Sequence, residues 1–168
     1  YRKLHLWGIE RQLYTPGDRA VVAETPVGRI GLSICYDLWF PELSRQLVLA
    51  GAELIASPAN WAGNPRMSDP LDRHGQAMGF QLARTTACVN EVPVIAADRI
   101  GSEDALTFLG NSSIVAASGE AIQGPAPVDA DALLVAELTL GPVADGRQSH
   151  MASRRPEIYA GVPGKDVS

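Results

Sequence analysis

The residue of this chain best suited to nucleophilic chemistry is Cys35. It follows an apolar run, residues 29–34, that predicts a buried strand, and it precedes Pro41 and Glu42, which are typical of the first turn of a helix. A thiol in this position lies near the partial positive charge of a helix N-terminus, which favours the thiolate, the form that attacks a carbonyl or nitrile carbon. The alternative is that Cys35 is a small hydrophobic core residue, as most free cysteines are.

Four segments of the chain together resemble one enzyme family. Residues 31–43 surround the cysteine, and residues 1–6 place Lys3 between a Tyr-Arg pair and a Leu-His-Leu sequence. Residues 57–61 and 154–159 follow in order. These segments resemble the nucleophile motif, the catalytic-lysine segment, the loop after the next core strand and the tail of the nitrilase (carbon–nitrogen hydrolase) superfamily. Because the matches run from one end of the chain to the other, the resemblance is specific.

The resemblance implies a role for each of four residues. Cys35 would attack the substrate carbon and form a thioester, while the ammonium of Lys3 and the backbone N–H of Tyr36 would stabilise the negative charge that develops on the substrate. Glu10 matches a second acidic position of the family, where a carboxylate holds the lysine and orients the substrate. Without the flanking motif, Lys3 would be a solvated lysine, and Glu10 beside Arg11 an ordinary surface pair.

Asn60 and Trp61 are expected to bind the substrate. They follow a short predicted strand, residues 53–57, and ligand sites in α/β sheets usually lie at the carboxyl ends of the strands. Trp61 would wall the pocket, although a tryptophan that caps the core is at least as common. The sequence has no metal-ligand spacing of histidines, cysteines or carboxylates and no phosphate-cradling glycine loop, so we expect neither a metal nor an organic cofactor.

The residues after Cys35 bear on the substrate. In the resembled superfamily, nitrile-cleaving members usually follow the cysteine with Trp-Glu, and N-carbamoyl amino acid hydrolases with Asn and a nearby arginine pair. Here Tyr36 and Asp37 follow, and Trp39 stands where an arginine would bind a carboxylate. We therefore predict a member of the amidase-like branch that converts a small carboxamide to an acid and ammonia.

Two alternatives stay open. Within the class, the chain could be a nitrilase or an N-carbamoyl amide hydrolase, since Arg99 or a further loop could supply the missing positive charge. Outside the class, it could be a non-catalytic fragment or interaction subunit with the same fold. A glutamate that completes the catalytic set would distinguish the enzyme from the interaction subunit.

Composition restricts the partners. The formal net charge of 168 residues is −5 and the pI is near 5.1, so there is no basic surface for nucleic acid or an anionic membrane. No apolar run approaches the roughly 20 residues that span a bilayer, and no export signal is seen. Two cysteines, Cys35 and Cys88, cannot build a disulfide framework, and Cys88 is expected to be a packing residue at the end of a helix. We expect a small-molecule amide partner and a cytoplasmic location.

Strands that alternate with helices predict an α/β chain. Residues 98–101 are expected to be a polar loop. The expected strands are residues 21–25, 29–34, 53–57, 92–97, 114–117, 121–122 and 133–140, and the expected helices are residues 41–50 and 71–89.

The resemblance narrows this class to the α-β-β-α sandwich of the nitrilase type. Residues 1–168 would form the C-terminal portion of one carbon–nitrogen hydrolase domain, with residues 141–168 as a tail that contacts another subunit in a homo-oligomer built from dimers. The family's general base is a glutamate upstream of the lysine, and only Tyr1 and Arg2 precede Lys3 here. We therefore expect an upstream segment to supply this glutamate and to cover sheet faces that the chain leaves open.

Overall fold

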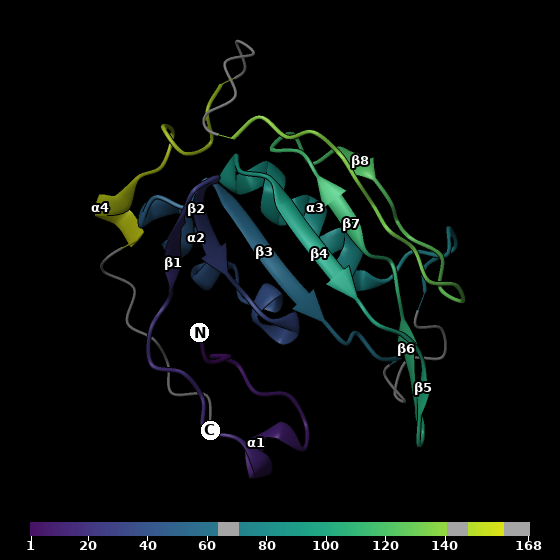
Figure 1. Cartoon of the computed structure of the whole chain (residues 1–168). Coiled ribbons are helices and arrows are strands. Elements are labelled where there is room, and N and C mark those ends of the chain that lie inside the picture. The colour runs from purple at the N-terminus through teal and green to yellow at the C-terminus, as the bar shows by residue number, and fades with distance from the viewer. Residues whose placement is uncertain (64–70, 141–147, 160–168) are drawn as a thin grey trace.

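A six-stranded mixed sheet with a parallel centre organises the chain (Figure 1). The computed structural model describes residues 1–63, 71–140 and 148–159. The three central strands run parallel, and each outer strand is antiparallel to its neighbour. In spatial order the six strands are β1 (Val22–Thr25), β2 (Gly28–Leu32), β3 (Leu54–Ala59), β4 (Val94–Asp98), β7 (Ser113–Val115) and β8 (Ala121–Gln123). The predicted α/β class is confirmed.

Two helices cover one face of this sheet. α2 (Pro41–Leu49) connects β2 to β3, and α3 (Met78–Asn90) connects β3 to β4. Because crossovers between parallel strands are right-handed, both helices lie on the same face, as Figure 1 shows. Pro41 occupies the first turn of α2, where its missing N–H costs no helical hydrogen bond. α3 ends where Glu91 adopts the left-handed conformation with φ of 58°.

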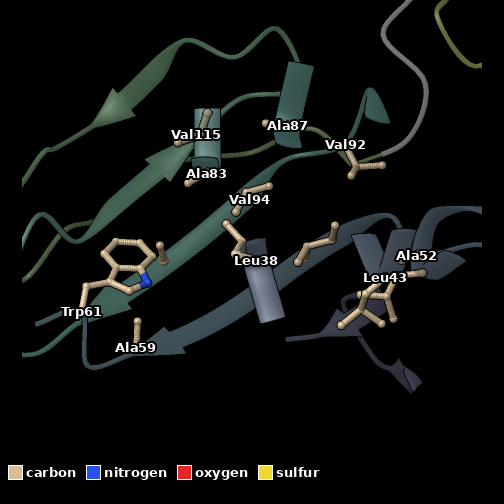
Figure 2. Close-up of a cluster of buried hydrophobic side chains, with 13 residues drawn as sticks. Leu38, Leu43, Ala52, Ala59, Trp61, Ala83, Ala87, Val92, Val94 and Val115 are labelled. Carbon is tan, nitrogen blue, oxygen red and sulfur yellow. The ribbon is translucent and has the colours of Figure 1, made fainter. Parts of the chain in front are cut away.

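The hydrophobic core lies between the sheet and these helices (Figure 2). Ile55 and Val94 are fully buried at adjacent positions of β3 and β4. Ala83 and Ala87 present only methyl groups from α3, so this helix can approach the sheet closely. Leu38, which follows the predicted nucleophile, is also buried in this cluster. The core therefore fixes the elements on both sides of Cys35.

The opposite face of the sheet is apolar but incompletely covered by the residues that the structure describes. Side chains alternate between the two faces of a strand, so alternate positions of β3 and β4 point away from the helices. Of these, Ala56 and Ile95 are half-buried and Pro58 and Ala97 are exposed. Another layer could pack on this face, in line with the expected sandwich.

Residues 98–101 do not form the predicted polar loop. Asp98 is the last residue of β4, and Ile100 begins a separate hairpin of β5 (Ile100–Glu103) and β6 (Leu106–Leu109). The prediction was wrong because the pairing partner of this segment, residues 106–109, lies beyond the turn and was not assigned as a strand.

Residues 133–140 are not the strand that their apolar composition predicts. The segment is irregular, and its side chains are largely in solvent: Leu133 is 90% exposed and Val135 is 71% exposed. A strand needs a hydrogen-bonded neighbour, and none of the described strands pairs with this segment. The hairpin predicted around residues 114–122 is confirmed as β7 and β8.

The predicted helix over residues 71–89 begins later, at Met78. Before it, the carboxylate of Asp72 accepts hydrogen bonds from the backbone N–H groups of His74 and Gln76, at 2.8 and 3.0 Å. This Asx-type turn offers the backbone an alternative to the helix, which therefore starts after it. Residues 71–77 instead form a turn closed by an antiparallel bridge between Leu71 and Ala77.

The described part of the tail packs on its own chain. The hydroxyl of Ser149 and the backbone N–H of His150 donate to the carboxylate of Glu91, at the end of α3. A short helix, α4 (Pro156–Tyr159), follows. Residues 141–147 and 160–168 of the predicted subunit-contact tail lie outside the described residues, and contact with another subunit stays a prediction.

No helix within the described ranges is both long enough and apolar enough to cross a membrane.

Candidate active site

The turn that carries Cys35 joins β2 to a short 3-10 helix, η1 (Cys35–Trp39), which leads directly into α2. Cys35 itself has a φ of 50°, in the left-handed region that residues with a side chain rarely adopt. Such backbone strain is held in place only where the surroundings fix it, and it is concentrated at functional sites. The buried Leu38 and the first turn of α2 supply that support here.

The surroundings of the Cys35 thiol act on its pKa in opposite directions. Burial raises the pKa above its ordinary value and is the largest influence. The backbone N–H of Asn60, which donates to the sulfur, and the positive charge of Lys3 lower it, while the carboxylates of Asp98 and Glu10 raise it. The net direction is upward, contrary to the prediction that the thiolate is favoured at this position, because burial has the largest effect.

Lys3 and Glu10 form a direct ion pair. The ammonium Nζ lies 2.6 Å from Glu10 Oε2, and the Lys3 side chain is only 10% exposed. The same carboxylate oxygen accepts the backbone N–H of Trp7 at 2.7 Å. Glu10 begins α1 (Glu10–Leu13). Since both charges also act on the Cys35 thiol, the structure brings these three predicted residues into one electrostatic site.

Asp37 attaches the N-terminal segment to the nucleophile turn. Its side chain is fully buried and accepts hydrogen bonds from the Tyr1 hydroxyl at 2.7 Å and the His5 backbone N–H at 2.9 Å. Nδ1 of His5 lies 2.8 Å from the same carboxylate, and the backbone N–H of Ile34 donates to it at 3.0 Å. The His5 ring also stacks on Phe40 with 3.6 Å between ring centroids. Lys3 is thereby held beside Cys35 by the residues on either side of it.

The hydrogen bond between Tyr1 and Asp37 also affects the pKa of Tyr1. The pKa of Tyr1 is raised by burial and by its hydrogen bond to the Asp37 carboxylate, so its hydroxyl stays a donor. No role was predicted for Asp37. The only signal was an acidic residue inside an otherwise apolar and aromatic stretch.

A cavity of about 410 Å³ opens at Cys35. Trp39 and Trp61 meet edge to face across it, with 6.4 Å between ring centroids. Gly79 of α3 lies against the Trp61 ring, where a side chain would collide with the indole. The cavity is lined by Trp7, Cys35, Tyr36, Trp39, Asn60, Trp61, Ala62, Met78, Gly79 and Leu109.

The lining places four predicted site residues together: Cys35, Tyr36, Asn60 and Trp61. Trp61 lines the cavity and also packs in the core cluster, where it is only 4% exposed. Lys3 and Glu10 are not among the lining residues, although their charges reach the thiol.

Cys88 and Arg99, the other two residues considered from the sequence, do not line the cavity. Cys88 is half-buried in α3 next to Gly119, away from this cavity, as expected of a packing residue. Arg99, the alternative source of positive charge, has its guanidinium 4.1 Å from the Phe108 ring centroid and 2.6 Å from Glu103, and it does not line the cavity. Within the described ranges, no group of three histidines, cysteines or carboxylates could hold a metal ion.

Asp98 is a second charged residue near the site, besides Asp37, for which no role was predicted. It lies at the carboxyl end of β4, next to the strand that leads to Asn60, and its carboxylate Oδ1 accepts the backbone N–H of Trp61 at 2.8 Å. Its signal in the sequence was its position directly after a predicted buried strand.

Comparison with known proteins agrees with this arrangement. Residues 1–148 match the family described as carbon-nitrogen hydrolase. The chain is 35% identical over 176 residues to N-carbamoylputrescine amidase of Arabidopsis thaliana, a match that covers 95% of this chain and 57% of that protein. It is 37% identical over 123 residues to "Probable nitrilase C965.09" of Schizosaccharomyces pombe, covering 73% of this chain and 42% of that protein. The chain thus spans about half the length of the curated relatives it matches.

Solved structures give the same result. A carbon-nitrogen hydrolase from Helicobacter pylori G27 superposes with a TM-score of 0.69 at 32% identity, over 78% of this chain and 48% of that one. A mutant amidase of the nitrilase superfamily from Nesterenkonia sp. AN1 superposes with a TM-score of 0.70 at 26% identity, over 95% of this chain and 54% of that one. That structure shows the acetamide moiety of fluoroacetamide added covalently at its active site cysteine. With the family match, these likenesses show that the chain belongs to the carbon-nitrogen hydrolase family of the nitrilase superfamily, and that the predicted fold type is confirmed.

Proposed function

We propose that this chain carries the nucleophile site of a cysteine-dependent amidase that hydrolyses a small carboxamide to the acid and ammonia. The observation that carries the proposal is the environment of Cys35. The Asn60 N–H donates to its sulfur, and the charges of the paired Lys3 and Glu10 act on it. Cys35 also lines a cavity of about 410 Å³. A nucleophile, a fixed positive charge and room for a small molecule therefore occur together.

The chemistry follows from these positions. The Cys35 sulfur attacks the amide carbon, and the negative charge that develops on the amide oxygen is stabilised by the Lys3 ammonium and the Tyr36 backbone N–H. The thiol proton passes through a general base to the leaving nitrogen, which departs as ammonia and leaves a thioester. Water, deprotonated by the same base, then attacks the thioester and releases the acid with a free thiol.

Lys3 is suited to charge stabilisation rather than to the role of base. Its Nζ donates to the Glu10 carboxylate at 2.6 Å, and the same carboxylate oxygen accepts the Trp7 N–H, so the pair holds a positive charge in a fixed position. Among the described residues, the carboxylates that act on the Cys35 thiol are Asp98 and Glu10. We place the general base on a glutamate upstream of Lys3, as the family's motif order implies.

This assignment is tested by comparing residues 1–168 expressed alone with a protein that also contains an upstream, glutamate-bearing segment. A missing general base costs about 10²–10⁴ in rate. The 168-residue chain alone should aggregate readily and be essentially inactive, because the described residues leave the second sheet face incompletely covered and the proposed base lies outside residues 1–168. Hydrolysis at ordinary enzymatic rates by the soluble 168-residue chain would refute the assignment.

The lining of the cavity favours a carboxamide without an anionic group. Among the described residues that line it, none carries a guanidinium or an ammonium, and indole, phenol and aliphatic groups form most of the wall that they make. A carboxylate-bearing substrate would lose its hydration there without an arginine to replace it. Arg99 is directed to Phe108 and Glu103 instead.

An N-carbamoyl amide is the second candidate substrate. The likeness to N-carbamoylputrescine amidases, at 35% identity over nearly the whole chain, favours it. The same attack of Cys35 on the carbamoyl carbon would apply, since a carbamoyl group is also an amide.

Steady-state kinetics on the whole protein distinguish the candidates. The carboxamide, its matched nitrile and its matched N-carbamoyl analogue are compared by kcat/KM, with ammonia release as the readout. We expect the carboxamide to have the highest kcat/KM, and Cys35→Ala to abolish turnover of all three while Cys88→Ala does not. A higher value for the nitrile or the N-carbamoyl analogue would replace the substrate assignment and leave the class of enzyme intact.

A further inference from the structure

Three residues, two that line the cavity and one whose charge acts on the Cys35 thiol, come from the carboxyl ends of three neighbouring parallel strands. Cys35 follows β2, Asn60 follows β3, and Asp98 ends β4, where it pairs in register with Ala59. Strand ends at one edge of a parallel sheet lie close together. Asp98 is therefore placed beside the nucleophile by the sheet itself.

Asp98 is fixed on the protein and in turn fixes the neighbouring loop. Its backbone N–H donates to the Ser112 hydroxyl at 2.8 Å, and that hydroxyl lies 3.2 Å from the Asp98 carbonyl oxygen. The carboxylate Oδ1 accepts the Trp61 N–H at 2.8 Å. The residue before Trp61 is Asn60, whose own N–H donates to the Cys35 sulfur. A continuous set of contacts thus runs from Asp98 through two consecutive peptide units to the nucleophile.

In the part of the chain that the structure describes, the second carboxylate oxygen of Asp98 has no neighbouring group that offsets its negative charge. Oδ2 is buried and has no hydrogen-bond partner among the residues that the structure describes. The neighbouring Arg99 does not neutralise it, since its guanidinium pairs with Glu103 over the Phe108 ring. Burial accordingly raises the pKa of Asp98 to about 7, against the opposing effect of the N–H groups of Trp61 and Arg99.

The charged groups that act on the Cys35 thiol come from two elements. The N-terminal segment contributes the ammonium of Lys3 and the carboxylate of Glu10, which largely offset each other as an ion pair. β4 contributes the carboxylate of Asp98, which has no cationic partner within the described ranges. Within the described ranges, the negative charge of Asp98 is therefore not offset by a neighbouring cation.

We infer that Asp98 is a positioning residue of the nucleophile site, which holds the Asn60–Trp61 loop against Cys35 and whose negative charge opposes that of the Cys35 thiolate. The inference rests on the proposed function for the role of Cys35 as nucleophile. Asp98 acts through the loop and through its charge, without contact to the reacting atoms.

The test measures the reactivity of the thiol separately from turnover. In the whole protein with Cys88→Ser as background, the rate of Cys35 alkylation by iodoacetamide is measured across pH 5–10. The variants are Asp98→Asn, which keeps an oxygen acceptor for the Trp61 N–H but removes the charge, and Asp98→Ala, which removes both. Asp98→Ser is a second neutral variant in case the first does not fold. Glu103→Gln is the matched control, a carboxylate-to-amide change on the adjacent hairpin.

Removal of the charge should move the midpoint of the alkylation profile to lower pH in Asp98→Asn, while Glu103→Gln leaves the profile unchanged. Amide turnover should fall much more in Asp98→Ala than in Asp98→Asn, because only the alanine variant releases the loop. An unchanged profile in folded Asp98→Asn and Asp98→Ser, or wild-type turnover in Asp98→Ala, would overturn the inference. If no amide is hydrolysed by any form, the proposed function fails, and the alkylation profiles still decide the effect of Asp98 on Cys35.

Discussion

The ammonium of Lys3 and the carboxylate of Glu10 lie 2.6 Å apart in a half-buried ion pair, and Glu10 also accepts the N–H of Trp7. This geometry fixes the direction of the lysine side chain. A charge that stabilises a developing oxyanion is effective only if it is already in place when the reaction occurs. The pair therefore gives Glu10 a role that acts through Lys3.

Glu10→Gln should lower kcat of the whole protein more than it raises KM. The amide keeps an acceptor for the Trp7 N–H but loses the charge that orients Lys3, and loss of one oriented oxyanion donor costs about 10²–10³ in kcat. Steady-state kinetics measure the effect. Glu24→Gln, a change in the exposed pair with Arg29, is the control and should leave kcat within a factor of about two. Unchanged kcat in Glu10→Gln would argue that Lys3 is held by other contacts.

Asp37→Ala should destabilise the fold severely. The change removes a fully buried carboxylate that accepts from Tyr1, His5 and Ile34, and breaking a buried charged network costs about 3–5 kcal/mol in the free energy of unfolding. His5→Ala removes one donor and the stack on Phe40 and should cost about 1–2 kcal/mol. Urea unfolding followed by circular dichroism gives both values. Equal stability of Asp37→Ala and the wild type would contradict the role of Asp37.

The nucleophile turn shows what local sequence can predict. The apolar run before Cys35 and the proline after it specify a strand, a turn and a helix start, and the structure has all three within a few residues. Lys3, Glu10, Asn60 and Trp61 could be singled out because they lie in motifs. Asp37 and Asp98 were not assigned, since their importance depends on partners 32 and 37 residues away.

The errors have the same origin. Residues 133–140 have a strand-like composition, yet a strand exists only with a hydrogen-bonded neighbour. The direction of the Cys35 pKa was wrong because the effect of burial depends on how the core closes around the turn, which no local pattern reports.

The stability of the protein should depend on Asp98 in a defined pH range. Burial raises its folded-state pKa to about 7 from 3.8. The folded state therefore binds this proton more tightly than the unfolded state, and the contribution of Asp98 to stability is lost as pH rises from about 4 to 7. Asp98→Asn should gain stability relative to the wild type over this range. Thermal unfolding at pH 4 to 8 measures the difference, and a difference that is constant with pH would contradict the raised pKa.

Trp39→Arg should change substrate preference. Trp39 lines the cavity and is 38% exposed, so a guanidinium there could reach a substrate carboxylate while remaining partly hydrated. Two substrates are compared by kcat/KM: a carboxylate-bearing amide and its neutral methyl ester analogue. We expect the ratio of the first value to the second to rise about tenfold in Trp39→Arg. A tenfold change corresponds to one favourable charge contact of about 1.4 kcal/mol. Trp39→Gln, which removes the indole without adding charge, should not raise the ratio. A rise in both variants would indicate that space rather than charge is decisive.

The most direct test of the account is the identity of the acylated residue. The whole protein is mixed with a small carboxamide and quenched in acid within one turnover, and the protease-digested peptides are analysed by mass spectrometry. A parallel reaction with hydroxylamine should trap the acyl group as a hydroxamate. The account predicts an acyl group on the peptide that contains Cys35, none on the Cys88 peptide, and none in Cys35→Ala. Acylation of Cys88, or full turnover by Cys35→Ala, would contradict it.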